Sequence, residues 1–112
     1  MSVKKFATIF EGLDEAFGTY EVQKTSASGK STGQARIVRE ERTSEHWKGH
    51  LSGKGASIGI IPINSENKCK WGCVDIDQYN LNHKELISKI RDLKLPLVIC
   101  RSKSGGGHIF LF

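Results

Sequence analysis

Long hydrophobic runs are missing from this chain of 112 residues. No segment approaches the roughly 18 consecutive apolar residues that a membrane-spanning helix needs, which excludes an integral membrane protein and a membrane partner. Residues 1–6 carry charges without an apolar run behind them, so we expect no secretory signal. The cysteines are odd in number (Cys69, Cys73 and Cys100), which argues against a disulfide framework and predicts reduced thiols in the cytoplasm.

Composition is that of a soluble globular protein. Apolar residues make up 38% and charged residues 26% of the chain, which excludes disorder throughout. At roughly 100–150 residues per domain, the chain is one domain or a fragment of one. The net charge of +5 is uneven, because residues 1–50 hold 8 basic and 7 acidic side chains whereas residues 51–112 hold 9 and 5. An anion-binding surface is therefore expected in the second half.

Residues 1–45 predict a helix and a flexible loop that lead into the rest of the chain. One amphipathic helix, ended by Gly18, is indicated by apolar residues at three- and four-residue steps: Phe6, Ile9, Phe10, Leu13 and Phe17. The small polar residues 25–33 predict a loop, and residues 34–42 a short polar strand.

The predicted loop contains Gly29-Lys30-Ser31, which is similar to the end of a phosphate-binding P-loop. A complete P-loop needs another glycine five positions before Gly29, and Lys24 stands there. We therefore exclude a P-loop.

Residues 46–112 carry sharper signals. Thr43-Ser44-Glu45 is typical of the start of a short helix. Asn82 is expected to cap a second helix, whose apolar face is formed by Leu86, Ile87, Ile90 and Leu93. Strands are predicted over residues 57–62, 69–77, 97–100 and 108–112. The order strand, helix, strand, loop, strand predicts a βαβ unit extended by a hairpin, and hence an α+β fold.

Asp75 and Asp77 are the first pair of chemically informative residues. Side chains two apart on a strand project from the same face, and two carboxylates there repel each other. A divalent cation removes that conflict, and Mg²⁺ or Mn²⁺ suits such oxygen ligands. The alternative is that both aspartates are solvated at the end of the strand.

A basic, glycine-rich loop is the second signal. Gly105, Gly106 and Gly107 allow the backbone to approach an anion closely. Positive charge comes from Arg101 and Lys103, hydroxyl donors come from Ser102 and Ser104, and His108 can donate to a phosphate oxygen. Carboxylates on one strand and such a loop nearby are what a metal-bound nucleoside triphosphate needs. Alone, the loop would be a flexible hairpin connection.

Together, residues 74–77 (VDID) and 100–110 (CRSKSGGGHIF) resemble the first two motifs of the archaeo-eukaryotic primases, a superfamily with phage, plasmid and conflict-system branches. Residues 50–62 are similar to the segment that leads into these motifs in the conflict-system branch. The resemblance covers about residues 46–112, and it is the pairing of the two motifs that is specific.

This resemblance implies an RRM-like catalytic sheet with packed helices that makes DNA or RNA strands from nucleoside triphosphates with two divalent metal ions. Asp75 and Asp77 would be metal ligands and catalytic, together with His108. The triphosphate would be held by Arg101, Ser102, Lys103, Ser104, Gly105, Gly106, Gly107 and His108. Expected partners are single-stranded DNA or a primer-template, a helicase domain, or a remaining C-terminal segment.

Two departures from the family pattern bear on activity. Gly106 occupies the position of the serine in the Ser-x-His form of the second motif. The third carboxylate of the family lies on a later strand, and no residues of this chain remain to supply it. We therefore expect the 112 residues to be a fragment of the catalytic domain, with an incomplete two-metal site.

Other polar and aromatic residues support a ligand less well. Cys69 and Cys73 do not have the usual zinc spacing, so structural thiols are favoured. His46 and His50 have no third ligand nearby, so a solvated or core-edge role is favoured for both. His83 is expected to be exposed in the first turn of its helix. Trp47 and Trp71 could stack on bases or pack.

Two alternative functions stay open. One is a non-catalytic, RRM-like nucleic-acid-binding module derived from a primase, which would differ in lacking metal and nucleotide binding at Asp75 and Asp77. The other is a glycosyltransferase that uses its own Asp-x-Asp motif, against which the short chain and the basic loop argue.

Overall fold

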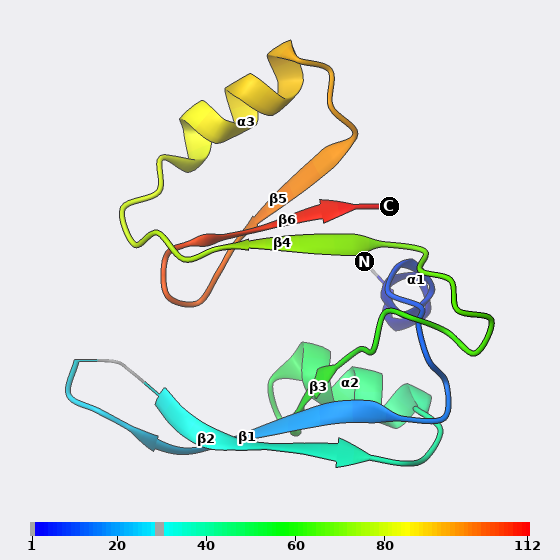
Figure 1. Ribbon diagram of the computed structural model, residues 1–112. Helices are drawn as coiled ribbons and strands as arrows, with labels where there is room; N and C mark the ends of the chain where they lie inside the picture. Colours follow the sequence, from blue (N-terminus) through cyan, green and yellow to red (C-terminus); the bar gives the residue numbers. More distant parts are fainter. Residues whose placement is uncertain (1, 29–30) are drawn as a thin grey trace. The chain divides into compact units, whose positions relative to one another are not determined.

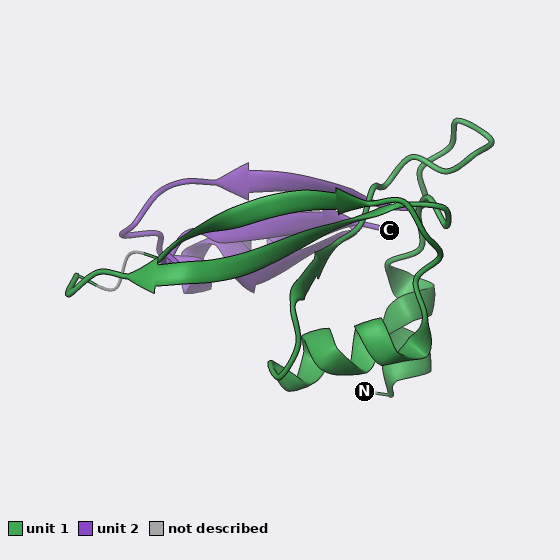
Figure 2. Ribbon diagram, turned by 90° about the horizontal axis from the view of Figure 1, so that it is seen from below, with its two compact units in different colours: residues 1–70 green, residues 71–112 purple. Residues whose placement is uncertain are grey.

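The computed structural model describes residues 2–28 and 31–112, and over these residues it contains three helices and two three-stranded antiparallel sheets (Figure 1). The predicted α+β class is therefore confirmed. The chain divides into two units, residues 1–70 and residues 71–112, which are coloured separately in Figure 2. Among the described helices, none is long and apolar enough to cross a membrane.

Unit 1 combines two helices with the first sheet. Its strand order is β2-β1-β3, and its elements are α1 (Val3–Ile9), β1 (Phe17–Thr25), β2 (Ser31–Val38), α2 (Ser44–Ser52) and β3 (Ser57–Gly59). Helix α2 begins after Thr43, as the sequence predicts. The hydrophobic core of unit 1 is small: among the described residues the buried hydrophobic side chains are Ala16, Phe17 and Trp47. The ring of Phe6 on α1 packs edge-on against Trp47, at a centroid distance of 5.7 Å.

The predicted helix over residues 6–17 is wrong in its second half. Helix α1 ends at Ile9, and Phe17 is the first residue of strand β1. The chain leaves the helix because Gly12 lies against the Ile61 backbone, where a Cβ would collide with the carbonyl oxygen, and Leu13 N–H donates to that oxygen at 2.9 Å. Apolar spacing identified Phe17 as buried but assigned it to the wrong element.

The predicted loop over residues 25–33 is also too long. Thr25 pairs with Ser31, so the strands of the β1–β2 hairpin take up residue 25 and residues 31–33 of this polar run. Gly33 within β2 leaves no room for a side chain, because an added Cβ would collide with the Glu21 carbonyl oxygen and with the Tyr20 ring. Gly29 and Lys30 of the excluded P-loop pattern lie outside the described residues, whereas Ser31 belongs to β2.

Two predicted strands are shorter than the sequence suggested. The run 57–62 contributes only β3, and the run 69–77 contributes only β4 (Gly72–Ile76). Cys69 instead forms an isolated bridge with Ile63 in unit 1. Apolar residues therefore extend beyond the segments that find a hydrogen-bonding partner.

Unit 2 is the predicted βαβ unit extended by a hairpin. It runs β4, α3 (His83–Asp92), β5 (Leu97–Arg101) and β6 (Gly107–Leu111), in the sheet order β4-β6-β5. Strand β6 is antiparallel to both neighbours, so β4 and β5 are parallel to each other and both end at the same edge. This is a split βαβ arrangement, the repeat on which ferredoxin-like sheets are built.

Helix α3 begins where the sequence predicts. The Asn82 side chain caps it by accepting a hydrogen bond from Glu85 N–H at 3.2 Å. An ion pair between Glu85 and Lys89, one turn apart at 2.8 Å, stabilises the exposed side of the helix. The segment before the helix places Leu81 against Gly107, on the sheet face that also carries Ile99.

Candidate active site

Strand β4 carries one of the predicted metal ligands and ends just before the other. Asp75 is the fourth residue of β4, and Asp77 follows the strand by one position. Both are exposed. Asp77 makes no side-chain hydrogen bond or ion pair within the described part of the chain. Its carboxylate therefore has no protein partner that a ligand would have to displace.

Strand β6 brings His108 to Asp75. The two residues are directly opposite in the β4–β6 register, and His108 Nε2 lies 3.3 Å from Asp75 Oδ1. The two residues are 33 positions apart in the chain. One belongs to the Asp-x-Asp motif and the other to the glycine-rich motif, which the sequence analysis expected to lie near each other. The imidazole ring also meets Phe110 edge-on, at a centroid distance of 6.2 Å.

A row of polar side chains continues across the sheet to Cys100. His108 pairs with Asp75 on one side and with Cys100 on the other, so all three occupy one face. Cys73 lies on the same face, two residues before Asp75. Burial raises the pKa of the Cys73 thiol above its ordinary value, and Asp75 raises it further. All three cysteines are free.

The glycine-rich loop between β5 and β6 is held closed by its own hydrogen bonds. Ser102 N–H donates to the Gly106 carbonyl at 3.0 Å, and Gly105 N–H donates back to the Ser102 carbonyl at 3.1 Å. The hydroxyls of Ser102 and Ser104 lie 3.2 Å apart. Because two backbone N–H groups are used inside the loop, an anion there depends on the remaining donors and on the side chains.

Glycine is favoured at three successive positions at the end of this loop, for different reasons. Gly105 has a φ of 93°, in the left-handed region that favours glycine. Gly106 and Gly107 are buried. A Cβ on Gly106 would collide with the Ile76 carbonyl oxygen, and one on Gly107 would come within 2.9 Å of Leu81. The serine of the Ser-x-His pattern therefore has no room at position 106.

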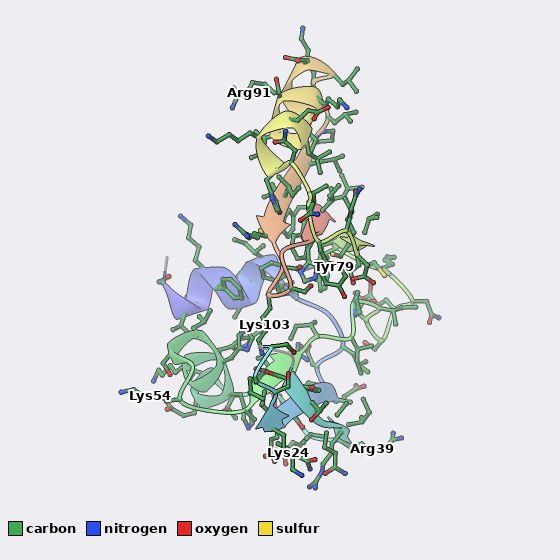
Figure 3. All side chains as sticks on the ribbon, turned by 90° about the vertical axis from the view of Figure 1, so that its left-hand side faces the viewer. Lys24, Arg39, Lys54, Tyr79, Arg91 and Lys103 are labelled. Carbon is green, nitrogen blue, oxygen red and sulfur yellow. The ribbon has the colours of Figure 1, made fainter. Side chains whose placement is uncertain are left out.

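The loop meets the turn that follows β4. A Cβ built on Gly105 would lie 3.3 Å from the Tyr79 carbonyl oxygen, so the two connections are in contact. Figure 1 shows both at the same end of the sheet, and Figure 3 labels Tyr79 on one and Lys103 on the other. Asp77 and the loop are thereby brought to one edge of unit 2.

Positive charge borders this edge. Arg101 is the last residue of β5, and its guanidinium lies 4.0 Å from the Cβ position built on Gly105. Lys103 is exposed within the loop. Both cations lie at the edge of the sheet where β4 and β5 end, a distribution suited to a ligand that carries both phosphates and a metal ion.

The carboxylates fit a divalent cation by the chemistry of their oxygens. Over residues 2–28 and 31–112, no three His, Cys, Asp or Glu side chains gather closely enough to hold a metal ion by themselves. Mg²⁺, however, is bound through one or two carboxylates, substrate phosphates and water in many nucleotide sites. Asp75 and Asp77 match that requirement for hard oxygen donors.

The two histidines considered as metal ligands have structural contacts instead. His46 Nδ1 accepts a hydrogen bond from Thr43 N–H at 3.0 Å, which closes the capping box of α2. His50 Nδ1 accepts from Ile58 N–H at 3.2 Å and connects α2 to β3. A shared metal would compete with both backbone bonds.

The tryptophans also have packing partners. Trp47 is 6% exposed and forms part of the unit 1 core, so it does not offer a face to a base. Trp71 lies beside Phe110, at a centroid distance of 6.1 Å. Of the two roles considered for these residues, stacking on bases and packing, both tryptophans have the packing role.

One contact of the loop was missed by sequence reasoning. His83, expected to be exposed, is half-buried, and its Nε2 lies 2.9 Å from the Gly106 carbonyl oxygen. Its position in the first turn of a capped helix, just after the Asp-x-Asp segment, was visible in the sequence. The partner was not, because it lies 23 residues away.

Comparison with known proteins agrees with the sequence motifs. The profile of a family described as the archaeo-eukaryotic primase domain of the TOTE conflict system matches residues 16–112. Among curated proteins, none matches the chain.

Proposed function

Because the chain belongs to the archaeo-eukaryotic primase domain family of the TOTE conflict system, we propose that unit 2 binds a nucleoside triphosphate with divalent cations for template-directed synthesis of DNA or RNA. The observation that carries the proposal is the contact between Asp75 on β4 and His108 on β6, 3.3 Å apart, where the glycine-rich loop ends. It joins the carboxylate motif to the loop motif in one place.

In this proposal Asp75 and Asp77 hold Mg²⁺ or Mn²⁺ together with the phosphates of the nucleotide. Bound cations of this kind neutralise the triphosphate and stabilise the attacking and leaving oxygens of phosphoryl transfer. The protein's part is to present two carboxylates at one edge of the sheet. Their exposure supports this role, because it leaves both side chains accessible to a cation and its phosphates.

The loop and its flanking residues bind the triphosphate. Arg101 and Lys103 supply charge that reduces repulsion between phosphates, and the Ser102 and Ser104 hydroxyls supply donors. The closed form of the loop supports this assignment, since donors that are already ordered need not be immobilised when the nucleotide binds.

His108 connects the two halves of the site. Its Nε2 faces Asp75 and orients that carboxylate, and it is the second residue of β6, the strand that follows the loop. A protonated imidazole would also donate to a phosphate oxygen. The substrates we propose are nucleoside triphosphates and a single-stranded or primer-template DNA.

Calorimetric titration of the 112-residue chain with ATP and dATP, with and without Mn²⁺, tests the proposal. We expect binding that requires Mn²⁺ and weakens at least tenfold in Asp75→Asn and in Asp77→Asn, because each variant removes a charged ligand of the cation. Asp92→Asn is the matched control, since it removes one negative charge from α3 in the same unit.

Two outcomes would contradict the proposal. Nucleotide binding that persists without Mn²⁺, or that survives both substitutions, would favour a nucleic-acid-binding module without a metal site. An equal loss in Asp92→Asn would show that net charge, and not Asp75 or Asp77, governs binding.

A further inference from the structure

His83 makes the one side-chain hydrogen bond that reaches the glycine-rich loop from α3 in the described part of the chain. Its Nε2 lies 2.9 Å from the Gly106 carbonyl oxygen, and the ring is half-buried. A carbonyl oxygen can only accept, so the Nε2 atom of His83 must be the donor. This fixes a proton on Nε2 whenever the bond is made.

Gly106 is restrained from several directions. Its carbonyl oxygen accepts a second hydrogen bond, from Ser102 N–H at 3.0 Å, so both lone pairs of that oxygen are used. Its Cα faces the Ile76 carbonyl so closely that no Cβ would fit. Without His83, the Gly106 carbonyl oxygen would keep only the hydrogen bond from Ser102 N–H, which lies within the loop itself.

His83 is held in place by the capped start of helix α3. His83 is the first residue of α3, and the preceding Asn82 caps the helix through Glu85 N–H. The cap therefore fixes the start of the helix independently of the contact between the imidazole and the loop. Gly106 in turn precedes β6, on which His108 is the second residue. A displacement of Gly106 would move the serine hydroxyls and the histidine that the proposed site uses.

From these contacts we infer that His83 is a positioning residue that holds the Ser102–Gly106 loop in its closed conformation. It touches neither carboxylate of the proposed site and acts through Gly106. Its effect on a nucleotide rests on the proposed function, whereas its effect on the loop does not.

The inference predicts separate consequences for the loop and for the ligand. In His83→Ala, the Ser102 amide should exchange with solvent about tenfold faster, since one net hydrogen bond is lost, and the Gly106 carbonyl ¹³C resonance should move upfield. Binding of ATP with Mn²⁺ should weaken about tenfold. In His83→Gln, whose side-chain amide nitrogen replaces Nε2, all three quantities should return toward the wild-type values.

The experiment is NMR-detected amide exchange and calorimetry on the full 112-residue chain, with Ser88→Ala as the control. Ser88 is an exposed residue of α3 whose hydroxyl contacts Asp92, away from the loop. Exchange of the Leu86 amide in α3, measured in the same samples, separates loop opening from unfolding of the helix.

Each outcome decides the inference. Faster Ser102 exchange with unchanged Leu86 exchange, restored by glutamine, supports it even if the wild-type chain binds no nucleotide, in which case only the proposed function fails. Unchanged Ser102 exchange in His83→Ala overturns it. Failure of glutamine to restore the loop, or equal acceleration of Ser102 and Leu86, also overturns it, because His83 would then act through packing of α3.

Discussion

At the scale of single residues, contact rather than backbone conformation determines which glycine of the loop is indispensable. Gly105 needs a positive φ, which asparagine or aspartate can also adopt at modest cost. Gly106 faces the Ile76 carbonyl, which no side chain can share. The second position of the glycine run is therefore the least replaceable for steric reasons.

Replacing Gly106 with alanine should lower the free energy of unfolding by about 1–3 kcal/mol, the usual cost of forcing an atom into a filled space. Gly72→Ala is the control, because a Cβ at Gly72 has open space around it, and its effect should stay within about 0.5 kcal/mol. Urea denaturation followed by circular dichroism measures both. Equal losses of stability in the two variants would show that the contact with the Ile76 carbonyl does not determine the cost of replacing Gly106.

The histidines show how far residue-level prediction reaches. Sequence spacing identified His108 as a site residue, and the structure places it 3.3 Å from Asp75. The hydrogen-bond partners of His46, His50 and His83 were not predicted, because each ring nitrogen faces a backbone group that only the fold brings near. A polar side chain can be recognised in a sequence, but its hydrogen-bond partner usually cannot.

At the scale of elements, α1 and α3 differ in how well their ends are encoded. Helix α3 has a capping asparagine, an acidic first turn and basic residues in its last turn, and its predicted start is correct. Helix α1 has a capping serine but ends at Ile9, with Phe10 as its C-cap and no glycine or proline at that point. Its end is set by the backbone of residue 61 and by Arg42, which donates to the carbonyls of Leu13 and Ala16.

Removing the cap in Asn82→Ala should destabilise unit 2 by about 1 kcal/mol, because the first turn of α3 loses the acceptor for Glu85 N–H. Asn80→Ala provides a matched control, since Asn80 is an exposed turn residue two positions earlier. Amide exchange of the first turn of α3 is the measurement. Comparable exchange in the two variants would contradict the cap assignment.

At the scale of the whole molecule, the two units differ in how much apolar surface they bury. Unit 1 contains the buried side chains of Ala16, Phe17 and Trp47. All of residues 71–112 are described, and none of their large apolar side chains is buried; Val74 and Leu93, for example, are 63% and 68% exposed. Burial of apolar area is the main source of folding free energy, so unit 2 has the weaker core of its own.

We expect unit 2 to unfold at a lower urea concentration than unit 1. Each unit contains one tryptophan, Trp47 or Trp71, so ¹⁹F NMR of chain labelled with 5-fluorotryptophan follows both units without a substitution. The Trp71 resonance should convert to its unfolded position first. Coincident midpoints for the two resonances would instead indicate a single cooperative transition.

The α+β class and the order of elements in unit 2 could be predicted, because hydrophobic periodicity, caps and glycine runs are local signals. The assignment of β6 to the centre of its sheet could not, since strand order depends on contacts between segments that are distant in the chain. The same limit applies to the site. Asp75 and the loop were identified separately, and only pairing through β6 brings His108 to Asp75.

The central position of β6 also determines when this sheet can form during synthesis. Strands β4 and β5 have no ladder with each other, and each pairs only with β6, the last of the three to leave the ribosome. Until Gly107–Leu111 has emerged, β4 and β5 lack the strand that joins them, and Asp75 has no His108 beside it. The sheet and the contact between Asp75 and His108 are therefore completed in one late, non-local step, which such a topology makes slower than helix formation.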